Sequence, residues 1–111
     1  MKISLSDLPK QISVPAKNSE LEIRYQSLEK QMTHPVIILD DDPTGIQTTH
    51  NTDLYTAWDR EVMEEIFTQN KKAFIQTNTR AFPESRVKML LNELMGNLLA
   101  ESRKQKKAFH I

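Results

Sequence analysis

The run VIIL at residues 36–39 constrains the fold of this chain more than any other feature. It is largely β-branched and continuous, whereas a strand with one wet face alternates apolar and polar residues. Such a run is typical of a strand that is buried on both faces, as in a parallel sheet. Parallel neighbours need crossover connections, which are usually helical. The run therefore predicts an α/β fold.

The remaining sequence supplies the other parts of that fold. Residues 53–58 and 73–77 are expected to form two more strands. Between them, Asp59 is the expected N-cap of a helix over about 60–70. A longer helix is expected to begin at Pro83, and its apolar residues follow helical spacing. Strands that alternate with helices predict a three-layer α/β sandwich with a mainly parallel sheet.

Residues 1–33 do not share this pattern and are expected to form a helical extension. The predicted helix covers 18–32, with Ser19 as its N-cap. Its apolar positions, which should share one face, are Leu21, Tyr25 and Leu28.

Residues 34–111 are expected to form the domain itself. Its last four residues, AFHI at 108–111, resemble the start of another strand, and the sequence ends there. A sheet cut at that point leaves unpaired backbone groups at its edge. We therefore expect an incomplete fold, as in a fragment of a larger protein.

Three carboxylates in a row follow the buried run directly. Neighbouring like charges repel each other, so they contribute nothing to folding and indicate a site. In open α/β sheets, ligands bind beyond the carboxyl ends of the strands. Two polar clusters are expected at that edge. They comprise Asp40, Asp41, Asp42, Thr44, Gly45, Gln47, Thr48 and His50 after the first strand, and Thr77, Asn78, Thr79 and Arg80 after the third.

The residue types in these clusters suit a small hydroxylated anion. Carboxylates accept hydrogen bonds from hydroxyls, hold Mg²⁺ or take a proton. Arg80 can bind a carboxylate or phosphate through two parallel hydrogen bonds. Gly45 permits either a close backbone approach or a positive φ.

Structural explanations compete with a functional one for single residues. Residues 42–45 have the composition of a plain turn, and Asp41 can simply face solvent. Arg80 can pair with Asp40 or Asp42, and a loop residue such as His50 is more often a bystander than a ligand. A turn needs one aspartate rather than three, which favours a functional role for the carboxylates.

Composition excludes several other classes of protein. Lys plus Arg and Asp plus Glu are equal at 15 each, which argues against a nucleic-acid-binding protein. The chain has no cysteine, which excludes disulfides and thiolate metal sites and favours the cytoplasm. Its 2 glycines are too few for a glycine-rich nucleotide loop, and no apolar run approaches the thickness of a bilayer. We therefore expect a cytoplasmic protein with no membrane or nucleic-acid partner.

Asp40, Asp42 and Thr44 form the pattern D-x-D-x-T after an apolar strand. This pattern resembles the first motif of the haloacid-dehalogenase-like phosphatases. That resemblance implies a nucleophilic first aspartate, a second aspartate that acts as acid and base, and Mg²⁺ bridging to phosphate. It covers only residues 40–44.

A second resemblance covers residues 34–111. The stretches VIILDDDPTGIQTTHNTDLYTAW and AFIQTNTRAFPES are similar to the N-terminal part of the four-carbon acid sugar kinases. Ile46 departs from the family pattern, which has a small polar residue at that position. The matching positions are Asp40 to Gly45, Gln47, Thr48, His50, Trp58 and Thr77 to Arg80.

The kinase resemblance implies ATP-dependent phosphorylation of a hydroxyl of a four-carbon sugar acid, such as a threonate, an erythronate or a 3-oxo-tetronate. In that family an N-terminal domain holds the sugar acid, and a C-terminal domain holds ATP and Mg²⁺. No metal ligand is assigned in this chain. The implied catalytic residues are Asp40 and Asp42, and the implied substrate-binding residues are Asp41, Thr44, Gly45, Gln47, Asn78, Thr79 and Arg80.

Residues 1–111 lack the nucleotide domain that the resemblance implies. The chain alone is therefore expected to be inactive, although its family is one of enzymes. Two alternatives stay open, a fragment of the phosphatase class and a non-catalytic module that binds a sugar acid.

Overall fold

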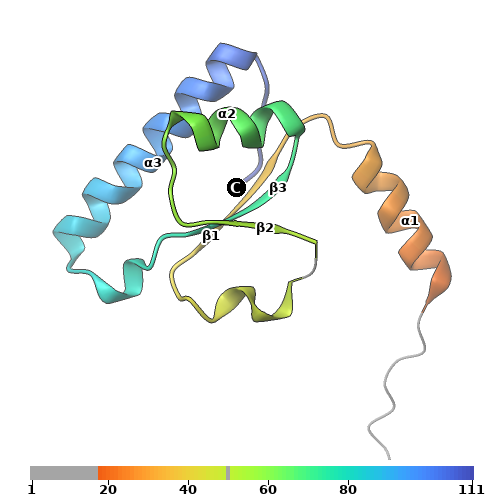
Figure 1. Cartoon of the computed structure of the whole chain (residues 1–111), viewed down its shortest axis with the longest axis horizontal. Helices are drawn as coiled ribbons and strands as arrows, with labels where there is room; N and C mark the ends of the chain where they lie inside the picture. Colours follow the sequence, from red (N-terminus) through yellow and green to blue (C-terminus); the bar gives the residue numbers. More distant parts are fainter. Residues whose placement is uncertain (1–17, 50) are drawn as a thin grey trace, which may run out of the picture. The chain divides into compact units, whose positions relative to one another are not determined.

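The computed structural model describes residues 18–49 and 51–111. The chain divides into two units, Met1–Gln31 and Met32–Ile111. The described element of the first unit is helix α1 (Ser19–Lys30). The second unit contains, in order, β1 (Val36–Asp40), the 3₁₀-helix η2 (Gly45–Thr48), β2 (Asp53–Tyr55), α2 (Arg60–Gln69), β3 (Lys72–Gln76), the 3₁₀-helix η3 (Thr79–Ala81) and α3 (Glu84–Gln105) (Figure 1).

The three strands form one parallel sheet in the order β1-β3-β2. Asp40 at the end of β1 is in register with Gln76 at the end of β3. On the other side of β1, Val36 forms a parallel bridge with His110, and the Ile37 N–H donates to the His110 carbonyl at 2.8 Å. The predicted α/β class and parallel sheet are confirmed. The sheet is small, with a single bridge next to β1 where a larger sheet has a full strand.

Helices α2 and α3 cover one face of the sheet. The β2–α2–β3 connection and the connection through α3 to His110 step across the sheet in the same direction, and right-handed crossovers of that kind place their helices on one face. Burying one large apolar side chain contributes about 1.5–3 kcal/mol, so this layer is the main source of stability. The core residues are Ile37, Ala73 and Ile75 from the strands and Met63, Ile66, Phe67, Leu94 and Leu98 from the helices.

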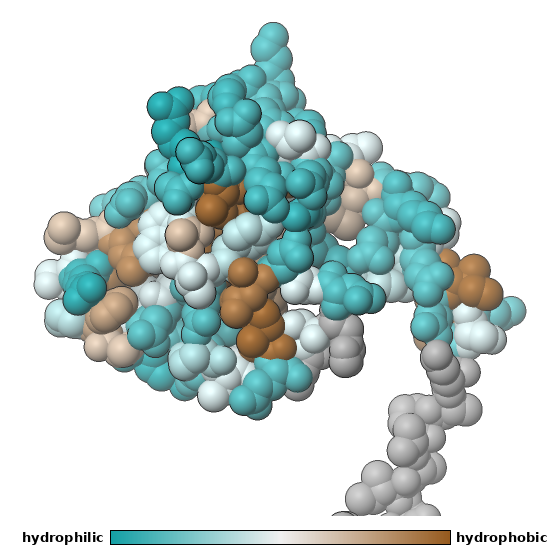
Figure 2. Space-filling view, in the orientation of Figure 1, coloured by the Kyte–Doolittle hydropathy of each residue, from teal (hydrophilic) through white to brown (hydrophobic). Residues whose placement is uncertain are grey.

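The opposite face of the sheet carries less cover. Ile38, Phe74 and Leu54 form one row across the three strands, because Phe74 is in register with both of the others. Phe74 is 8% exposed, whereas Ile38 and Leu54 are 37% and 43% exposed. The connection that contains η2 runs on the side of the strands away from α2 (Figure 1). Hydrophobic side chains reach the surface among hydrophilic ones (Figure 2).

Local capping fixes the ends of α2. The Asp59 carboxylate accepts hydrogen bonds from the Glu61 and Val62 amides at 3.0 Å each, so it satisfies two of the free donors at the helix start. At the other end, Asn70 adopts the left-handed conformation with a φ of 50°. The predicted cap at Asp59 is confirmed.

Helix α1 differs from the expectation in its cap. Asn18 is the N-cap, since its side-chain oxygen accepts the Leu21 N–H at 3.3 Å. The prediction of Ser19 was wrong because both residue types cap helices well and the sequence does not distinguish two neighbours. No residue of α1 is buried, and Leu21, Tyr25 and Leu28 are each more than half exposed.

Two strand boundaries also shift. β2 ends at Tyr55 rather than at Trp58, and β3 covers 72–76 rather than 73–77. Thr77 therefore begins the loop that follows β3, where its amide bonds back to the end of β1. The polar residues of the two clusters consequently start at the same edge of the sheet.

Candidate functional site

The two predicted clusters meet at the carboxyl edge of the sheet. We call residues 40–45 the acidic corner and residues 77–80 the arginine bend. β1 leads into the first and β3 into the second, and these strands are direct neighbours. The Thr77 amide and the Thr77 hydroxyl both donate to the Asp40 carbonyl, at 2.8 Å and 2.9 Å. Thr77 is only 4% exposed, so the bonds that join the two segments are buried.

Asp42 organises the turn within the acidic corner. Its Oδ1 accepts hydrogen bonds from the Thr44 amide at 2.9 Å and from the Thr44 hydroxyl at 2.7 Å. These two bonds, together with the nearby positive charge of Arg80, hold the pKa of Asp42 below its ordinary value. Asp42 therefore stays ionised at neutral pH with one side of its carboxylate already committed to the turn.

Gly45 lies directly against the Asp40 carboxylate. A Cβ at position 45 would lie 2.0 Å from Asp40 Oδ2, which no real contact tolerates. The Asp40 Oδ1 accepts the Asp42 amide at 3.1 Å. Gly45 has no positive φ, so of the two roles expected for it the structure supports the close approach. The side chain of Asp40 is thus fixed in place by backbone on two sides.

Arg80 pairs with two carboxylates of the corner. Its Nη1 lies 2.5 Å from Asp42 Oδ2, and its Nε lies 3.3 Å from Asp41 Oδ2. The Arg80 amide also donates to the Asp41 carbonyl at 3.4 Å. The sequence left open a pairing with Asp40 or with Asp42. The structure shows the pairing with Asp42 and adds one with Asp41, which therefore does not simply face solvent.

The other predicted residues lie around this centre. Asn78 is exposed and adopts the left-handed conformation with a φ of 52°, which turns the chain from β3 into η3. The Thr79 and Thr77 hydroxyls are 3.1 Å apart and share a hydrogen bond. Gln47 is exposed in η2. His50 lies outside the described residues.

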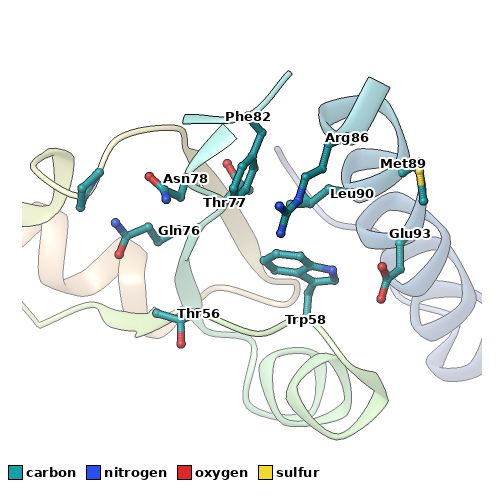
Figure 3. A pocket seen from close by; sticks show the side chains of 11 residues that line it. Thr56, Trp58, Gln76, Thr77, Asn78, Phe82, Arg86, Met89, Leu90 and Glu93 are labelled. Atoms are coloured by element: carbon teal, nitrogen blue, oxygen red, sulfur yellow. The ribbon is translucent and has the colours of Figure 1, made fainter. Parts of the chain in front are cut away.

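A pocket of about 590 Å³ opens beside the acidic corner (Figure 3). Pro43 and Asn78 line it on the side of the two clusters, and α3 forms another wall. Its size is within the range of small-molecule sites. The lining residues are Pro43, Thr56, Trp58, Gln76, Thr77, Asn78, Phe82, Arg86, Met89, Leu90 and Glu93.

The polar or aromatic lining residues that the sequence neither assigned to the site nor matched to a family motif are Thr56, Gln76, Phe82, Arg86 and Glu93. Trp58 was noted only as a matching position of the kinase family. An arginine or a glutamate in a helix normally indicates a solvated surface, so no local signal marked Arg86 or Glu93. The signal that was present is Trp58, the one tryptophan of the chain, which is the last residue of an expected strand.

A further charged cluster lies at the opposite, amino edge of the sheet. Lys71 Nζ lies 2.6 Å from Asp53 Oδ2 and 2.7 Å from Glu65 Oε1, and the Tyr55 hydroxyl donates to Glu65 at 3.1 Å. The hydrogen bond to Asp53, followed by that to Glu65, raises the pKa of Lys71 above its ordinary value. This cluster connects β2, α2 and the start of β3, and its groups satisfy one another, so it has a structural role.

Within residues 18–49 and 51–111, no three His, Cys, Asp or Glu side chains converge to hold a metal ion. In the same part of the chain, no helix has both the length and the apolarity that crossing a membrane requires. Searches against family models, curated proteins and solved structures found no match to this chain.

Proposed function

We propose that residues 34–111 are the sugar-acid-binding part of a four-carbon acid sugar kinase. The observation that carries this proposal is the convergence of the acidic corner and the arginine bend at one edge of a parallel sheet. Ligands bind at that edge in folds of this kind. The same two segments contain the residues that resemble the family motifs.

The chemistry of the corner suits a polyhydroxy ligand. The carboxylates of Asp40 and Asp42 can accept hydrogen bonds from hydroxyls, and each already accepts one from a backbone amide that holds it in place. We assign to them the binding of substrate hydroxyls or the removal of a proton from the attacked hydroxyl. Thr44 and Gly45 shape the turn, and Asp41, Gln47, Asn78, Thr79 and Arg80 surround it.

Phosphoryl transfer depends mainly on positioning and on stabilising charge. ATP supplies the phosphoryl group, and Mg²⁺ offsets its charge. The acidic corner does not fit Mg²⁺, because Asp41 and Asp42 already pair with Arg80 and no group of three metal ligands converges among the described residues. We therefore assign only the sugar acid to this chain and propose that the nucleotide is held by another part of the enzyme. A cytoplasmic location follows from this proposal.

The test is calorimetric titration of the purified chain with L-threonate and D-erythronate. We expect saturable binding, which Asp40→Asn weakens while the unfolding midpoint stays within experimental error. Glu61→Gln is the matched control, because Glu61 is an exposed acid in the first turn of α2, outside the corner. No phosphate transfer from ATP is expected from the chain alone.

Three results would contradict the proposal. If neither sugar acid binds, four-carbon sugar acids are excluded as the ligands of this chain. Equal binding by the wild type and Asp40→Asn would return the carboxylates to a structural role. Release of phosphate from p-nitrophenyl phosphate with Mg²⁺ and without ATP would instead favour the phosphatase class.

A further inference from the structure

The site contains two arginines in different electrostatic situations. Arg80 has Asp41 and Asp42 within ion-pair distance, so two negative charges already surround its guanidinium. A carboxylate that approached Arg80 would meet this excess of negative charge. Attraction for a further anion is correspondingly weak at that position.

Arg86 lacks such acidic neighbours. Among the described residues it forms no ion pair, and its partner is the ring of Phe82, whose centroid lies 4.0 Å from the Arg86 Cζ. Stacking on a ring face leaves the N–H groups at the edge of the guanidinium available to an acceptor. Figure 3 shows the Arg86 side chain lying between Phe82 and Trp58, within the pocket.

The remaining polar groups of the pocket suit the rest of a hydroxy acid. Gln76, Thr77 and Asn78 line it next to the acidic corner and offer amide and hydroxyl groups. Glu93 also lines it and is its one lining carboxylate. Glu93 is not within ion-pair distance of Arg86 in the described structure. It therefore makes the electrostatic potential of the pocket more negative but leaves the Arg86 guanidinium open to a ligand.

We infer that Arg86, rather than Arg80, receives the carboxylate of the bound acid through two parallel hydrogen bonds. The assignment of the ligand as a hydroxy acid rests on the proposed function, whereas the role of Arg86 as a carboxylate receptor in this pocket does not. Arg80 then acts as a positioning residue that holds Asp41 and Asp42 for the hydroxyl end of the ligand.

Trp58 makes the inference directly testable. It is the only tryptophan of the chain and lines the pocket, so its fluorescence reports occupancy there. The full chain is titrated with L-threonate, with the neutral polyol erythritol and with succinate, an acid without hydroxyls. Arg86→Gln is expected to weaken the binding of both acids roughly tenfold to a hundredfold, the usual effect of losing a charged hydrogen-bond donor. The affinity for erythritol should stay unchanged.

Three further variants separate charge, geometry and position. Arg86→Lys is expected to recover part of the affinity, because it keeps the charge and loses the paired hydrogen bonds. Glu93→Gln is expected to strengthen acid binding. Arg103→Gln, an exposed arginine near the other end of α3, is the control and should change nothing.

The outcomes distinguish this inference from the proposed function. If Arg80→Gln removes the preference for acids over erythritol and Arg86→Gln keeps it, the inference is overturned and the proposed function stands. If succinate binds through Arg86 and threonate does not bind, the inference stands and the proposed function falls. If no acid alters Trp58 fluorescence in the wild type, the inference is overturned.

Discussion

Gly45 is the residue whose replacement affects the corner most directly. The Cβ of Gly45→Ala would overlap the Asp40 carboxylate, which must swing away. We expect sugar-acid binding to be lost and the unfolding free energy to fall by about 1–3 kcal/mol, the usual cost of overpacking, because the Asp40 side chain at the end of β1 is held by backbone on two sides. Calorimetry and urea unfolding measure the two effects.

The chain offers a matched control for this variant. A Cβ at Gly96, within α3, meets no atom within 4 Å. Gly96→Ala should therefore stabilise the protein by about 0.5–1 kcal/mol through helix propensity and leave binding unchanged. Equal loss of binding in both variants would show that the contact with Asp40 is unimportant.

The turn at Asp42 predicts a specific pH dependence. Because the folded-state pKa of Asp42 is lowered, its bonds contribute stability above the unfolded-state pKa of about 3.9, and this contribution is lost as pH falls through the lower folded value. Thr44→Val removes one of the two bonds to Asp42. We expect the pKa of Asp42 to rise part of the way towards its ordinary value, as followed by NMR of the carboxyl carbon.

Thr79→Val is the control for this titration. The Thr79 hydroxyl bonds to Thr77 rather than to Asp42, so the pKa of Asp42 should stay unchanged. An unchanged midpoint in Thr44→Val as well would show that the backbone bond and Arg80 account for the shift by themselves.

At the scale of elements, the cluster at the amino edge connects β2, α2 and β3. Lys71→Met keeps an apolar stem and removes the charge that Asp53 and Glu65 share. We expect the unfolding free energy to fall by about 1 kcal/mol, the upper range for partly exposed pairs. Lys88→Met, which breaks an exposed pair with Glu84 inside α3, should cost about 0.3–0.5 kcal/mol.

The pKa of Lys71 sets the upper pH limit of the stability that this cluster contributes. The folded-state pKa of Lys71 is raised, so the contribution is complete below the unfolded-state pKa of about 10.4 and is lost as pH rises through the higher folded value. The difference between wild type and Lys71→Met should therefore stay constant from neutral pH to about pH 10. A difference that vanishes by pH 8 would contradict this account.

Local signals predicted some elements well and others poorly. Helix α2 was predicted from Asp59 as its cap, because that signal lies in the residue next to the helix and does not depend on distant contacts. The apolar residues of α1 followed helical spacing, yet none is buried. Periodicity predicts which residues share a face, whereas burial depends on what packs against that face.

At the scale of the whole molecule, the sequence predicted which segments reach the site but not how their charges pair. The carboxyl ends of parallel strands share an edge, so the meeting of residues 40–45 with 77–80 could be expected. The pairing of Arg80 with Asp41 and Asp42 depends on the conformations of the acidic corner and the arginine bend, which the sequence pattern does not specify. Arg86 was missed for a related reason, since its place in the pocket depends on how α3, which packs against α2, lies relative to the residues that follow β3.

The bonds from Thr77 to the Asp40 carbonyl join residues that are 37 positions apart in the chain. An unfolded polypeptide does not hold such distant segments together, so any compound that fits the site recognises the native state alone. It must then shift the melting temperature upwards, by the equivalent of about 2.7 kcal/mol when present at a hundred times its dissociation constant. A thermal-shift screen of hydroxy acids can accordingly rank natural candidates before any reaction is assayed.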